Sequence, residues 1–128
     1  MKKAATVLVA LVAIEHVYIL VLEMFLWTKP AGLRAFGLTP EFAEQTAVLA
    51  ANQGLYNGFL AAGLFWSLIR KADRFPLQVF FLGCVIVAGV FGAFTAKMSI
   101  LYIQAMPAAV ALLVVWLANR KALNEAAL

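Results

Sequence analysis

The sequence predicts an all-α integral membrane protein, a bundle of four transmembrane helices with both termini in the cytoplasm. Apolar residues make up 66% of the chain and charged residues only 12%, and the mean hydropathy is +0.97. This profile lies outside the range of soluble domains. The apolar residues also gather into four runs, each long enough to cross the hydrocarbon core, for which about 20 helical residues suffice. Backbone groups find no water in lipid, so runs of this kind must be helical.

The four predicted spans occupy almost the whole chain, which we interpret as a single transmembrane domain, residues 1–128. The second span begins with Thr39, Pro40 and Glu41, which are typical of an N-cap, a first helical position and an acidic first turn. The third begins at Pro76, after the charged turn 70–74, and a short turn around Lys97 precedes the fourth. The spans are therefore placed at about 4–27, 40–69, 76–96 and 99–118.

The basic residues give the predicted orientation. Seven of the ten lie on one side of a chain with four spans and three on the other. Basic residues are enriched in cytoplasmic segments, so this bias places both termini in the cytoplasm. The net charge of +4 reflects this topology, and we expect the lipid bilayer as a partner and no nucleic acid. The larger group is Lys2, Lys3, Arg70, Lys71, Arg74, Arg120 and Lys121, and the smaller is Lys29, Arg34 and Lys97.

The sequence offers little for metal or cofactor binding. Cys84 is the single cysteine and His16 the single histidine. Neither a disulfide within the chain nor a zinc-type ligand spacing can be built from them. We therefore expect no metal and no cofactor, with Cys84 acting as a small apolar residue in its helix.

Three ionisable residues interrupt the first span. Glu15 and His16 lie near its middle and Glu23 follows closer to its outer end. An ionisable side chain near the centre of a bilayer costs about 2.5 to more than 10 kcal/mol, depending on the estimate. At about 100° per residue all three share one side of the helix. A helix that only anchored the protein in the membrane would not carry three ionisable residues along one side.

The second span has a polar face and a separate face of small residues. On the predicted topology its amides, together with polar groups of the later spans, fall in the non-cytoplasmic half of the bundle. We therefore predict an outward-facing polar pocket with Glu15 at its floor, and an ion pair between Glu23 and Lys97 at its rim. The predicted ligand- or proton-binding residues are Glu15, His16, Asn52, Gln53, Asn57 and Gln104.

The small residues predict close helix packing. Gly54, Gly58 and Ala62 recur at intervals of four on the second span, as do Ala88, Gly92 and Ala96 on the third. Small residues at this spacing let two helix backbones approach each other in a membrane. We therefore expect the second and third spans to pack through these stripes, within the chain or between copies.

Several strings of the sequence together resemble one protein family. They are Glu15-His16, Glu23-Met24-Phe25-x-Trp27, Asn52-Gln53-Gly54-x-Tyr56-Asn57-Gly58 and Gln104-x-x-Pro107-Ala108. The chain resembles, over almost its whole length, the small bacterial inner-membrane proteins with four spans classified as domain of unknown function 1304. The resemblance implies four helices and a multi-pass location in the bacterial inner membrane, and it implies no activity.

Three functional classes remain open from the sequence. The first is binding or transport of a small amphiphile or cation, with proton linkage at Glu15. The second is a membrane-embedded enzyme in which Glu15 and His16 act as acid and base on a lipid-soluble substrate. The third is a structural or accessory protein whose polar residues fix helix register. A homo-oligomer is compatible with all three, and the sequence does not decide whether the chain is an enzyme.

Overall fold

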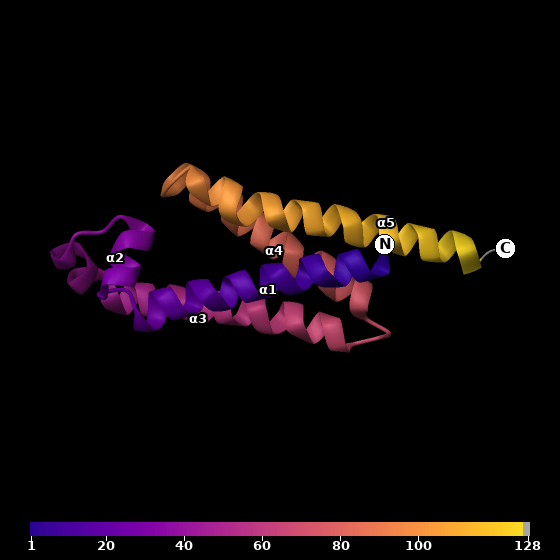
Figure 1. Ribbon diagram of the computed structural model, residues 1–128, viewed down its shortest axis with the longest axis horizontal. Helices are drawn as coiled ribbons and strands as arrows, with labels where there is room; N and C mark the ends of the chain where they lie inside the picture. Colours follow the sequence, from indigo (N-terminus) through magenta and orange to yellow (C-terminus); the bar gives the residue numbers. More distant parts are fainter. Residues whose placement is uncertain (127–128) are drawn as a thin grey trace. The chain divides into compact units, whose positions relative to one another are not determined.

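The computed structural model describes residues 1–126 and folds them into helices joined by short turns (Figure 1). The prediction of an all-helical chain is confirmed. Residues 127–128, the end of the predicted domain, lie outside the described part. The helices are α1 (Lys2–Phe25), α2 (Pro30–Phe36), α3 (Pro40–Ile69), α4 (Arg74–Thr95), the π-helical segment η1 (Leu101–Ala105) and α5 (Met106–Ala126).

Three helices within residues 1–126 are long and apolar enough to cross a membrane. They are α1, α4 and the continuous segment Leu101–Ala126. The 30-residue α3 is not among them, because three amides in its middle, at 52, 53 and 57, lower its hydropathy. Large apolar side chains are widely exposed on the helices, with Val48 at 87% and Phe94 at 80%. Exposure of this extent suits a chain that is surrounded by lipid.

The helix boundaries follow local sequence signals and differ from the predicted spans at several points. The backbone N–H of Phe42 donates to the Thr39 side chain at 3.3 Å, which confirms Thr39 as the N-cap of α3. The segment 28–37, expected to be a break between helices, contains the short helix α2. In addition, α5 continues beyond residue 118 to Ala126, so the helix extends past the apolar run that predicted it.

The backbone contacts divide the described chain into two compact units. One contains Met1–Ala13 together with the chain from Ala62 onward, and the other is Ile14–Ala61. Both α1 and α3 contribute residues to each unit. We call them the terminal unit and the hairpin unit.

The core of the terminal unit is built by α4 and α5, which pack side by side (Figure 1). The two helices bury mainly small and β-branched side chains, which allow their backbones to approach closely. At the closest point a Cβ added at Gly89 would lie 2.9 Å from both the Cβ and the backbone nitrogen of Ala105. The buried positions are Gln78, Leu82, Val85, Gly89 and Ala93 on α4, and Ala108, Ala111, Val115 and Ala118 on α5.

A π-helical turn precedes α5 at this contact. The backbone N–H of Met106 donates to the carbonyl of Leu101, five residues earlier. Pro107 follows directly and has no N–H to donate, and a proline ring crowds the carbonyl four residues before it. The wider turn accommodates this crowding. The apolar pattern of the fourth span predicts a regular helix, and the π-helical turn differs from this prediction.

Candidate functional site

The hairpin unit is formed by the second half of α1, the helix α2 and the first half of α3. Its two long segments approach closely at Gly54 and Gly58 of α3. A Cβ added at Gly54 would lie 2.6 Å from Met24 Cγ, and one added at Gly58 would lie 2.7 Å from Leu20 Cδ1. A larger residue at either position would require the Met24 or Leu20 side chain to shift, and at Gly54 its Cβ would also lie 3.2 Å from the carbonyl oxygen of Leu20. The two glycines therefore allow the two helices to pack closely.

This contact corrects the expected packing of the small-residue stripes. Gly54 and Gly58 were predicted to face the third span, but their nearest neighbours are Leu20, Glu23 and Met24 of α1. The glycines lie about 60° to 100° from Asn57 around the helix. Because Asn57 bonds to a carboxylate of α1, the small residues beside it face α1 as well.

The connection between the two segments is held by the side chain of Trp27. Its Nε1 donates a hydrogen bond to Thr46 Oγ1 on α3 at 3.0 Å, and its ring lies 4.8 Å from that of Phe36. Gly32 of α2 packs directly against the backbone carbonyl of Leu26, so no larger residue fits there. Gly37 ends α2 with a φ of 68°, the left-handed conformation that glycine adopts readily. These contacts close the end of the hairpin.

A carboxylate and an amide meet between α1 and α3. Asn57 Nδ2 donates a hydrogen bond of 2.8 Å to Glu23 Oε2 and one of 3.2 Å to the carbonyl of Gln53. Glu23 and Asn57 are both partly buried. Within Ile14–Ala61 no basic side chain forms an ion pair with either Glu15 or Glu23. The carboxylate of Glu23 is thus held by a neutral donor.

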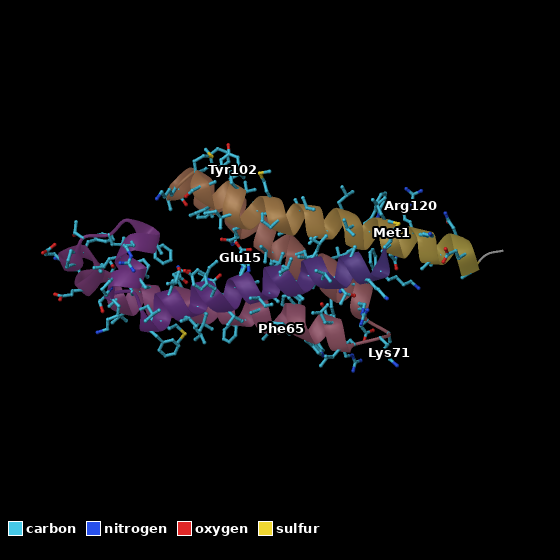
Figure 2. The ribbon with its side chains drawn as sticks, in the orientation of Figure 1. Met1, Glu15, Phe65, Lys71, Tyr102 and Arg120 are labelled. Atoms are coloured by element: carbon cyan, nitrogen blue, oxygen red, sulfur yellow. The ribbon has the colours of Figure 1, made fainter. Side chains whose placement is uncertain are left out.

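Glu15 and His16 lie further along the same helix, two turns from Glu23. Glu15 is partly buried near the middle of α1 (Figure 2), and His16 is fully buried with an exposed fraction of 0%. The sequence predicts one polar pocket that contains both Glu15 and Asn57, with Glu15 at its floor. The structure instead pairs Asn57 with Glu23, because the close contacts of Gly54 and Gly58 fix a register in which Asn57 lies opposite Glu23.

The other candidate residues are more dispersed. Asn52 and Gln53 belong to the hairpin unit, but both are exposed on α3. Gln104 is partly buried within η1, and Lys97 is exposed just before it. These last two belong to the terminal unit. The ion pair between Glu23 and Lys97 stays a prediction.

The hairpin unit therefore joins one pair of the predicted polar residues, Glu23 and Asn57. A carboxylate whose neighbour is a neutral amide keeps an uncompensated charge when ionised, and it can take up a proton or a cation. Sequence reasoning missed the contributions of Trp27, Thr46 and Gly32, which fix the end of the hairpin. The string Trp27 to Gly37 contains these residues, but nothing in the sequence pairs Trp27 with Thr46.

The fold and the site define a class: small all-helical chains with long apolar helices and ionisable groups inside them. Comparison with known proteins gives the family. The DUF1304 family, described as proteins of unknown function, matches residues 10–116, and the chain belongs to this family. It is similar to the uncharacterized protein YpaA of Lactococcus lactis subsp. lactis (strain IL1403), with 30% identity over 109 residues, 84% of this chain and 92% of the relative. No solved structure matches the chain significantly.

Proposed function

We propose that the chain is a multi-pass protein of the bacterial inner membrane that binds or transports a small cation or cationic amphiphile, with proton linkage at Glu15. In this proposal α1, α3, α4 and the η1–α5 segment are the four spans, both termini are cytoplasmic, and the polar site opens outward. The long apolar helices α1 and α4 support the membrane location. The amides of α3 would then face a polar interior rather than lipid.

One observation carries the proposal: α1 holds two partly buried carboxylates, and neither pairs with a basic side chain within the hairpin unit. Glu23 accepts its hydrogen bond from Asn57, which leaves its negative charge in place. In a medium of low dielectric constant such a group must be neutralised. Protons and cations would compete for the two carboxylates, which is the chemistry of proton-linked cation binding.

The test is to replace the carboxylate of Glu15. Purified full-length protein in detergent would be titrated with tetraphenylphosphonium, a hydrophobic cation, by isothermal titration calorimetry at alkaline and mildly acidic pH. The wild type should bind more weakly at acidic pH, because protons compete with the cation. Glu15→Gln should weaken binding by about 10-fold or more and remove the pH dependence, since an isosteric amide carries no charge.

The control is Glu41→Gln, which removes a carboxylate exposed at the start of α3. It should bind the cation with the affinity and pH dependence of the wild type. Retention of both properties in Glu15→Gln would contradict the role of Glu15. Thermal unfolding of each variant would establish that it remains folded.

One observation favours a second candidate, a structural role for the polar residues. The bond between Asn57 and Glu23 joins two helices at 2.8 Å, next to the close contact at Gly54. Interhelical bonds of this kind stabilise membrane helices by about 0.6 to 2 kcal/mol. If cation binding is absent in the wild type while Glu23 and Asn57 both contribute to stability, this second role is the correct one.

A further inference from the structure

A cavity of about 460 Å³ lies within the terminal unit, and neither Glu15 nor Glu23 lines it. Four segments of the chain line it: the start of α1, the turn after α3, the start of α4 and the end of α5. Met1, Lys71 and Arg120 lie at this end of the terminal unit (Figure 2). The site does not depend on the proton-linked cation binding proposed above, but the choice of its ligand rests on the membrane location and orientation in that proposal.

The lining of this cavity is strongly basic. Lys2, Lys71 and Arg74 contribute to it, and no acidic residue does. The nearby carboxylate of Asp73 forms a salt bridge of 2.8 Å with Arg70. The cavity therefore carries a positive charge that no lining side chain offsets, and such a surface attracts anions.

Arg74 is held in place by the chain itself. Its Nη2 donates to the carbonyl of Leu68 at 2.6 Å, and its Nε lies 3.4 Å from the carbonyl of Arg70. A guanidinium has five N–H donors, so these two bonds leave others available. Fixing the guanidinium in advance lowers the entropy that a ligand must overcome to bind it.

A buried amide completes the lining. Gln78 is only 4% exposed and lines the cavity, yet its side chain forms no hydrogen bond with any residue between 1 and 126. The amide of Gln78 therefore faces the cavity, where it stays available as a donor and an acceptor. A polar ligand in the cavity would supply the missing bond. This is the observation that distinguishes the cavity from an ordinary basic surface.

The start of α4 adds backbone donors. Arg74 and Phe75 are its first residues and both line the cavity. The side chain of Asp73, at the N-cap position, forms no capping hydrogen bond. The first N–H groups of a helix have no partner within it and carry partial positive charge, which favours a phosphate group.

We propose that this cavity binds a phosphate-bearing anion, with Lys2, Lys71 and Arg74 neutralising its charge and Gln78 donating to its oxygens. The apolar side chains of Phe75 and Val115 in the same lining favour the headgroup of an anionic phospholipid over a free ion. Basic pockets between helices at the cytoplasmic surface are suited to such headgroups.

The proposal is tested with purified full-length protein in a zwitterionic detergent. Binding of short-chain phosphatidylglycerol, phosphatidylcholine and inorganic phosphate would be measured separately by intrinsic tryptophan fluorescence and by the shift in thermal unfolding temperature. The wild type should bind phosphatidylglycerol and not phosphatidylcholine. The double substitution Lys2→Gln with Lys71→Gln should weaken phosphatidylglycerol binding by about 30-fold.

The matched control removes the same charge nearby. Arg120→Gln with Lys121→Gln alters two basic residues of α5 that are exposed and do not line the cavity. This variant should bind phosphatidylglycerol within about two-fold of the wild type, because screened surface charges contribute little. Equal losses in the two double variants would overturn the proposal, since general surface charge would then explain the binding.

Gln78→Leu separates a binding role from a structural one. Because the Gln78 amide has no hydrogen-bond partner among residues 1–126, the variant should unfold at the same temperature as the wild type, or higher, when lipid is absent. Its phosphatidylglycerol affinity should nevertheless fall by about five-fold to ten-fold. Unchanged affinity would exclude Gln78 as a ligand-binding residue and overturn the proposed site.

Inorganic phosphate distinguishes the two sources of the anion. Binding of phosphatidylglycerol alone supports a lipid site, whereas binding of inorganic phosphate with the same losses in the cavity variants supports a site for a free anion. Binding of neither one overturns the proposal.

Discussion

The hydrogen bond between Asn57 and Glu23 is the clearest polar contact between α1 and α3. At the level of single residues the sequence indicates which side chains are out of place in lipid, because charge and amide groups stand out from apolar runs. The sequence did not indicate which of these polar side chains contact one another. The predicted pocket contains Glu15 and Asn57 together, but which side chains bond depends on the helix register, which follows from the close approach at Gly54 and the length of the connection through α2. Neither the close approach at Gly54 nor the effect of the connection length can be read from a pattern in the sequence.

This bond leads to a prediction about stability. Asn57→Leu keeps the approximate volume of the side chain but removes the donor, so the free energy of unfolding should fall by about 1 to 2 kcal/mol. Glu23→Gln keeps an acceptor oxygen for Asn57 and should cost less than Asn57→Leu. Unfolding in mixed micelles, followed by circular dichroism, would measure both.

The exposed amide of Asn52 provides the comparison, because it lies one turn and a half away on the same helix. Asn52→Leu should leave the free energy of unfolding unchanged within about 0.5 kcal/mol. If Asn52→Leu and Asn57→Leu have the same effect, the bond to Glu23 contributes nothing specific to stability.

At the level of elements, long helices were predictable and short or irregular ones were not. Thr39 and Pro40 mark the start of α3 because capping chemistry is local. By contrast, α2 has seven residues, too few for apolar periodicity to show, and its Pro30 and Gly32 resemble a break. Pro107 alone did not predict the π-helical turn that precedes it, because this turn also depends on the contact between Ala105 and α4.

The close contact between Gly89 of α4 and Ala105 predicts that substitution by alanine will have opposite effects at Gly89 and at Gly83. Gly89→Ala would place a methyl group 2.9 Å from the backbone nitrogen of Ala105, and this backbone cannot yield easily. The substitution should destabilise the protein by about 1 to 3 kcal/mol, despite the better helix propensity of alanine. Unfolding in mixed micelles measures the change.

Gly83 is the matched control on the same helix, since a Cβ added there meets nothing within 4 Å. Gly83→Ala should therefore be neutral or stabilising by up to about 1 kcal/mol. A stabilising effect of both substitutions would mean that α4 and η1 are not in close contact at Gly89.

At the level of the whole molecule, the distribution of basic residues is the property most directly encoded in the sequence. It requires no knowledge of packing, because Lys and Arg resist translocation wherever they lie near a span. The cavity of the terminal unit could not be predicted in this way. Lys2, Lys71 and Arg74 share the expected cytoplasmic side, but only the fold brings them around Gln78.

The proposed topology of four spans gives a final prediction, which also decides whether α3 crosses the membrane. In a Cys84→Ala background, single cysteines would replace the exposed residues Ala35, Ala96, Ala72 and Asn124, which leaves every charge in place. In intact cells a membrane-impermeant maleimide should label cysteines at 35 and 96, and those at 72 and 124 only after the membrane is opened. If α3 does not cross, residues 35 and 72 lie on the same side and become labelled together. Labelling of 72 and 124 in intact cells, with 35 and 96 protected, would instead mean that the chain is inserted in the opposite orientation and that the basic cavity faces outward.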